Sequence, residues 1–160
     1  TYFQYDILPD ILCLAKGIGA GFPMGAFVAN KKFAAAMEPG DHGSTYGGNP
    51  MAGQACRTVF KILEDTKMID HVQDISEYLI EKLDDLQEEF PCIKERRGLG
   101  LMIGLEFDKP VKDIVKTCLD LGLIVVTAGP HVVRMLPPFI TTEKDVDQAI
   151  AILKEAIEKN

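Results

Sequence analysis

The sequence has 160 residues, of which 47% are hydrophobic and 26% charged, so it should fold around a core. Its 17 basic and 24 acidic residues give a formal charge of −7, which argues against a nucleic-acid partner because an acidic chain repels phosphate backbones. The sequence shows no membrane span, no signal peptide and no metal-ligand spacing, and its four scattered cysteines fit a reducing compartment. We therefore expect a cytoplasmic protein without membrane, nucleic-acid or metal partners.

The first part of the chain alternates short apolar runs with glycine-rich loops. Residues 11–15 (ILCLA) and 24–30 (MGAFVAN) predict two short strands, and one or two helical turns follow. Residues 41–50 (DHGSTYGGNP) predict a loop. A helix follows to about residue 66, because Asn49 is a good N-cap and Pro50 suits the first turn.

A long amphipathic helix opens the second part of the chain. It is predicted over 68–90, where Pro91 ends it, and apolar residues at helical spacing give it a buried stripe. The members of this stripe are Val72, Ile75, Leu79, Leu83, Leu86 and Phe90.

Strands and two further helices complete the second part. Residues 93–107 predict two strands around a glycine-rich bend, with ERRGLG as a turn that carries solvated arginines. A short helix over 111–122 should precede two strands, 123–129 and 131–138. A last helix is capped by Thr142, and its inner face comprises Val146, Ile150, Leu153 and Ile157.

Lys16 ends the apolar run 11–15 and is followed by four glycines and a proline within nine residues. One interpretation is a lysine whose ammonium group simply reaches water from a strand end. The other is a Schiff-base lysine, because partial desolvation favours the neutral amine, which can attack an aldehyde. The glycines would then let the backbone approach a flat ligand.

Two further places could hold an anion. Ser44 and Thr45 lie in the glycine-rich loop before a helix, which is either an ordinary connection or a site with hydroxyl and backbone N–H donors. Arg134 lies among apolar residues of a predicted strand, where a guanidinium needs a partner. That partner is either a structural carboxylate or a substrate carboxylate bound by both arms of the guanidinium.

Four stretches, taken together, resemble the second half of class III aminotransferases, a pyridoxal-phosphate-dependent family of fold type I. In chain order they are PDILCLAKGIGAGFPMGAF, HGSTYGGNPMA, RGLGLMIGLEF and AGPHVVRMLPP. Their order and spacing agree along nearly the whole chain. The resemblance implies an α/β fold in which residues 1–67 form the end of the large cofactor-binding domain with an interdomain helix. Residues 68–160 would then form a small C-terminal α+β domain.

The resemblance also implies a role for each candidate residue. Lys16 matches the lysine that bonds covalently to pyridoxal phosphate and then moves a proton as general acid and base. Thr45 matches a threonine that binds the cofactor phosphate, typically in the active site of the other subunit of a homodimer. Ser44 matches a substrate-contacting position beside it, and Arg134 matches the arginine that binds the α-carboxylate of the substrate.

Within the family, the chain is most similar to the branch that transfers an amino group from N-acetylornithine to 2-oxoglutarate in arginine biosynthesis. The features that carry this similarity are the AG before VVRMLPP and the compact length after Lys16. Branches that use ornithine or 4-aminobutyrate stay open as alternatives. So does a non-catalytic α+β module that binds a ligand or a partner and keeps the sequence without the chemistry.

The front half of the family has no counterpart in this sequence. That half supplies the aspartate at the pyridine nitrogen, the aromatic residue stacked on the ring and the phosphate loop. Together with the start at Thr1, this leads us to expect a fragment that is inactive alone. Residues 1–67 should then leave strand edges and apolar faces open, while 68–160 should be able to fold independently.

Overall fold

The first unit of the chain, Thr1–Thr66, is built on a pair of short antiparallel strands. The structure is a computed structural model that describes residues 2–160. Strand β1 pairs with β2 so that Ile11 lies opposite Ala29, and both strands predicted here are confirmed. The elements are η1 (Tyr2–Tyr5), β1 (Ile11–Ala15), η2 (Gly17–Gly19), β2 (Gly25–Ala29), α1 (Lys31–Ala34) and α2 (Pro50–Asp65).

Helix α2 begins as the sequence predicts. The side chain of Asn49 accepts a hydrogen bond from the backbone N–H of Ala52 (2.9 Å), and Pro50 occupies the first turn. This unit nevertheless buries little apolar surface, because Phe27 and Val28 on β2 are 45% and 58% exposed. The predicted open apolar faces are therefore confirmed.

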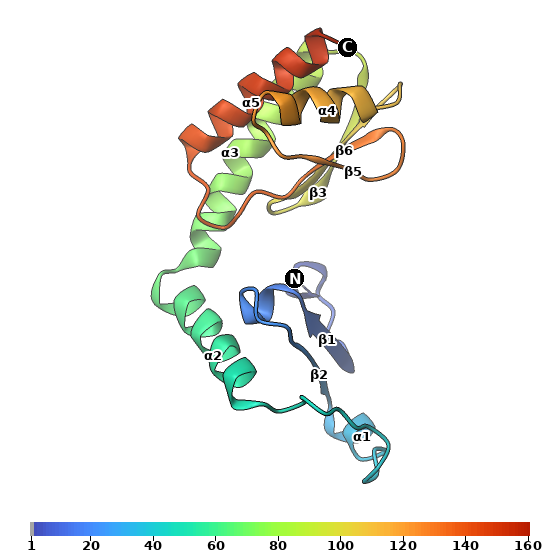
Figure 1. Cartoon of the computed structure of the whole chain (residues 1–160), viewed down its shortest axis with the longest axis vertical. Helices are drawn as coiled ribbons and strands as arrows, with labels where there is room; N and C mark the ends of the chain where they lie inside the picture. Colours follow the sequence, from blue (N-terminus) through green and yellow to red (C-terminus); the bar gives the residue numbers. More distant parts are fainter. Residues whose placement is uncertain (1) are drawn as a thin grey trace. The chain divides into compact units, whose positions relative to one another are not determined.

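The second unit, Lys67–Asn160, holds a four-stranded antiparallel sheet in the order β3-β4-β6-β5. Figure 1 shows helices α3, α4 and α5 gathered on one side of this sheet. The elements are α3 (Met68–Glu89), β3 (Ile93–Leu99), β4 (Met102–Phe107), α4 (Lys112–Asp120), β5 (Val126–Thr127), β6 (Val132–Met135) and α5 (Glu143–Glu158).

The core of the second unit lies between the helices and the sheet. The predicted stripe of α3 is confirmed, with its four central members buried and its two outer members, Val72 and Phe90, partly buried against the core. The predicted inner face of α5 is also confirmed, because Val146, Leu153 and Ile157 are buried and Ile150 is partly buried against the core. The strands contribute Ile93, Ile103, Leu105, Phe107, Val133 and Met135.

Two predictions about this sheet are wrong in detail. The strand expected over 123–129 pairs only at Val126–Thr127, and Gly129, whose φ is +81°, lies in the turn that leads to β6. The segment expected as a turn belongs to β3, because the bend comes later, at Gly100. Arg96 is consequently half-buried and binds Asp84 of α3 through two hydrogen bonds of 2.5 and 3.0 Å.

The cap of α5 should make this helix sensitive to acid. The backbone N–H and hydroxyl of Thr142 donate to the Asp145 carboxylate (2.9 and 2.7 Å), which lowers the pKa of Asp145 below its ordinary 3.8. The folded chain then binds this proton less tightly than the unfolded chain does. The cap therefore contributes its full stability at pH values above 3.8. This contribution is lost as the pH falls through the lower pKa that Asp145 has in the folded chain. We expect Thr142→Ala to remove most of this dependence, whereas Lys144→Ala, which removes only the smallest cause of the lowered pKa, should keep most of it, as measured by amide exchange in the first turn of α5.

Cys118 should give the second unit an alkaline dependence as well. Its side chain is fully buried, and burial raises the pKa of the thiol from 9.0 to about 11. The unfolded chain loses this proton first, so stability falls as the pH rises from 9.0 to about 11. In Cys118→Ala this part of the loss should be absent, which denaturant midpoints on either side of that interval would show. An unchanged pH dependence in the variant would contradict the assignment.

Candidate functional site

Lys16 follows β1 directly and has a strained backbone. Its φ of +65° and ψ of −86° lie outside the conformations that a non-glycine residue ordinarily adopts. Within residues 2–160, no hydrogen bond or ion pair engages its ammonium group. The predicted position at a strand end is confirmed, but Lys16 is exposed rather than partly desolvated, since two short strands cannot enclose it.

Two of the glycines after Lys16 have a clear structural cause. A Cβ at Gly19 would come within 2.9 Å of Cγ of Met24, and Gly21 has a φ of +95°. By contrast, Gly17 has open space where a Cβ would stand. Within residues 2–160, no neighbouring atom therefore requires glycine at position 17, and close approach to a flat ligand stays a prediction there.

The loop before α2 presents free hydroxyl groups. Ser44 lines a pocket of about 450 Å³ together with Gly47, Gly48 and the start of α2. Neither Ser44 nor Thr45 has a side-chain hydrogen bond within the described part of the chain. Such donors at a helix N-terminus fit an anion. Lys16 and Thr45 do not line this pocket.

Arg134 lies on β6 in the second unit, opposite Gly104 on β4 and Val126 on β5. The residue is half-buried, and its Nε is fully buried without a hydrogen-bond partner. No carboxylate of residues 2–160 pairs with this guanidinium. The structural partner that the sequence left open is thus not seen there, and the unpaired group fits the carboxylate of a ligand.

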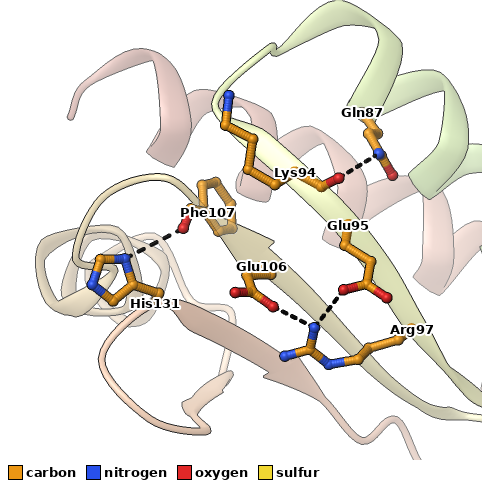
Figure 2. A network of polar contacts seen from close by, with 7 residues as sticks. All are labelled: Gln87, Lys94, Glu95, Arg97, Glu106, Phe107 and His131. Carbon is orange, nitrogen blue, oxygen red and sulfur yellow. Dashed lines mark hydrogen bonds and ion pairs between the residues drawn. The ribbon is translucent and has the colours of Figure 1, made fainter.

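A charged cluster beside Arg134 was missed from the sequence. Arg97 of β3 donates from Nη1 to Glu95 (2.7 Å) and also to Glu106 of β4, and Figure 2 shows its guanidinium between the two carboxylates. From the sequence, Arg97 was expected to be a solvated turn residue. The alternation of Glu95 and Arg97 along one strand face was the signal that could have revealed the cluster.

Neither a membrane span nor a metal centre emerges from residues 2–160. None of their helices has both the length and the apolar character needed to cross a bilayer. In the same residues, no three side chains of the metal-binding types gather closely enough to hold an ion.

The chain belongs to the class III aminotransferase family, whose model, described as aminotransferase class-III, matches residues 1–157. This family depends on pyridoxal phosphate. Within it, the chain is similar to acetylornithine aminotransferases. It is 42% identical over 158 residues to that of Clostridium acetobutylicum and 40% identical over 157 residues to that of Bacillus subtilis. Each alignment covers 98% of this chain but only 41% and 40% of the relative, so the chain spans about two fifths of these curated relatives.

Solved structures agree with this membership. The ornithine aminotransferase of Plasmodium yoelii matches 99% of this chain and 43% of its own, with a TM-score of 0.92 and 28% identity. The acetylornithine aminotransferase of Elizabethkingia anophelis matches 99% of this chain and 41% of its own, with a TM-score of 0.91 and 25% identity. The predicted fold class, the C-terminal part of a fold-type I transferase, is confirmed.

Proposed function

We propose that the protein to which this chain belongs is a cytoplasmic, homodimeric aminotransferase of arginine biosynthesis. It would move an amino group from N-acetylornithine, or a similar ω-amino acid, to 2-oxoglutarate. Residues 1–67 would serve as the end of the large cofactor-binding domain and 68–160 as the small domain. The similarity to acetylornithine aminotransferases along 98% of the chain supports this substrate choice.

The observation that carries the proposal is the strained backbone of Lys16. Strain of this kind persists where function requires a side chain at a particular place, and here it holds a free amine at the end of β1. The other candidate residues have matching chemistry. Thr45 offers a hydroxyl for a phosphate, Ser44 offers a hydroxyl for the substrate, and Arg134 offers a guanidinium with a buried, unpartnered Nε for a carboxylate.

Each residue then has a defined task. When bound, pyridoxal phosphate supplies an aldehyde that accepts the amino group and a ring that withdraws electrons. Lys16 would hold the cofactor through its amine, and that amine would take and return a proton at the reacting carbon of the substrate. Thr45 donates to the phosphate in the active site of the other subunit, and Ser44 contacts the substrate. Arg134 fixes the carboxylate of the amino acid or of the oxo acid.

Covalent labelling tests the role of Lys16. The chain is mixed with pyridoxal phosphate, reduced with borohydride, and digested for mass spectrometry of modified lysines. We expect the peptide that contains Lys16 to carry most of the label, and we expect Lys32→Ala, a change at another exposed lysine, to leave that label unchanged. Equal labelling of many lysines in the longer polypeptide as well would contradict the proposal and favour the non-catalytic module.

Activity requires a second test. We expect residues 1–160 alone not to transaminate, because Lys16 is exposed and its surroundings do not exclude water. The longer polypeptide should be assayed with N-acetylornithine, ornithine and 4-aminobutyrate, each with 2-oxoglutarate. If kcat/KM is higher for ornithine or for 4-aminobutyrate than for N-acetylornithine, the protein belongs to the branch of the family that uses that substrate.

A further inference from the structure

The loop that carries Ser44 and Thr45 is held to β2 by a contact between two rings. The imidazole of His42 lies beside the phenyl ring of Phe27, with 6.0 Å between the ring centroids and 57° between the ring planes. Attractive aromatic pairs adopt separations and tilts of this kind. Because the two rings come from different segments of the first unit, their contact fixes where the loop lies on the strand.

The pocket beside the loop gives the same placement. Ala26, the residue before Phe27 on β2, lines the pocket of about 450 Å³ together with Ser44 and Gly47. The middle of β2 and the middle of the loop therefore border one space. Two separate observations thus place this loop against β2.

Phe27 is a firm support because β2 is paired along its length. The strand pairs with β1 from one end to the other, and Phe27 itself lies opposite Cys13. Just beyond the paired residues, the backbone N–H of Asn30 donates to the carbonyl oxygen of Asp10 (2.9 Å). Lys16 follows the other end of β1. The pair of strands that ends in the candidate cofactor lysine therefore also carries the ring that supports the loop.

The hydrogen bonds of the loop give it a shape but not a position. The backbone N–H of Glu38 donates to the Asp41 carboxylate (2.7 Å), and the backbone N–H of Gly47 donates to the carbonyl oxygen of Ser44 (3.3 Å). At the far end of the loop, the side chain of Asn49 caps α2. These bonds join residues that are close in the sequence. The ring contact supplies the tie to β2 that such local bonds cannot supply.

We propose that Phe27 and His42 are positioning residues, which hold the loop on β2 so that Thr45 reaches the phosphate of the cofactor. The inference rests on the proposed phosphate contact of Thr45. The two rings act through the backbone, since His42 lies only three residues before Thr45. A loop already held at His42 has less conformational freedom to lose when the phosphate binds.

Two aldehydes that differ only in the phosphate-bearing arm test this role. The longer polypeptide is titrated with pyridoxal phosphate or with 5-deoxypyridoxal, reduced briefly with borohydride, and analysed for the fraction of Lys16 that is labelled. We expect Phe27→Leu and His42→Ala to raise the half-saturating concentration of pyridoxal phosphate about twofold to tenfold, which is what an aromatic pair contributes. Both variants should leave that of 5-deoxypyridoxal unchanged. Phe27→Tyr, which keeps an aromatic ring, should bind both aldehydes as the parent protein does.

A matched control and a double variant show whether the ring contact is responsible. Phe60 of α2 is 46% exposed, against 45% for Phe27, so Phe60→Leu removes a similarly exposed ring and should leave both concentrations unchanged. Phe27→Leu/His42→Ala should lose no more affinity than either single variant, because each change removes the same contact. Equal losses for the two aldehydes, or losses that add in the double variant, would overturn the inference.

Thr45→Val distinguishes a failure of this inference from a failure of the proposed function. If Thr45→Val weakens binding of pyridoxal phosphate alone, the phosphate contact stands, and unchanged binding in Phe27→Leu overturns only the inference. In the Thr45→Val background, Phe27→Leu should then cause no further loss. If Thr45→Val does not weaken pyridoxal phosphate more than 5-deoxypyridoxal, the proposed role of Thr45 fails, and the inference fails with it.

Discussion

Replacing Gly98 by alanine is expected to destabilise the second unit by about 4 kcal/mol or more, enough to unfold much of a domain of this size. Gly98 lies in β3 with a φ of +137°, a conformation that side chains rarely adopt. A Cβ there would stand 2.1 Å from the carbonyl oxygen of Met102 and 2.9 Å from Cα of Ile103. Both are backbone atoms of β4, so relief requires the β3–β4 pair to separate.

Gly100 provides a matched control two residues away. It also has a positive φ, +60°, but a Cβ there would meet nothing within 4 Å. Gly100→Ala should therefore carry only the left-handed backbone penalty, about 1–2 kcal/mol. Guanidinium unfolding of both variants, followed by circular dichroism, measures the difference. Equal destabilisation would mean that the close approach of the two strands does not constrain residue 98.

The contrast between these two glycines shows what could be predicted from the sequence. The stripes of α3 and α5 were predictable because helical spacing alone decides which residues face the core. The requirement for glycine at position 98 could not be predicted, because it arises from the carbonyl oxygen of Met102 on the partner strand. The residues of one strand do not determine its register with another. For the same reason, the sequence did not reveal that β5 pairs over only two residues.

The candidate site divides in the same way. Lys16 at the end of β1 followed from an apolar run that stops before a glycine-rich segment. The exposure of the Lys16 side chain could not be predicted from the sequence, because it depends on which other segments cover β1. For Arg134 the sequence left two kinds of partner open. The choice between them depends on which side chains of the neighbouring strands lie beside Arg134, and the pairing of strands is not fixed by the residues of one strand alone.

The second large effect is expected at Lys16 itself, where function and stability should change in opposite directions. Lys16→Gly should abolish selective labelling by pyridoxal phosphate and borohydride, because it removes the amine. It should also stabilise the β1–β2 pair by about 1 kcal/mol, because glycine adopts a positive φ freely. Backbone strain of about 1–3 kcal/mol is relieved, and the greater flexibility of glycine in the unfolded chain offsets about 0.5–1 kcal/mol of the gain.

Lys16→Ala separates the two effects, because alanine removes the amine but keeps a Cβ and hence the strain. Both variants should lose the label, whereas amide exchange in β1 and β2 should be about fivefold slower in Lys16→Gly than in Lys16→Ala, as a difference of about 1 kcal/mol requires. Selective labelling that survives in either variant would exclude Lys16 as the cofactor lysine. Equal exchange rates would show that the backbone at residue 16 stores no strain. The expected pattern would mean that this chain gives up stability at one residue to hold an amine where the chemistry needs it.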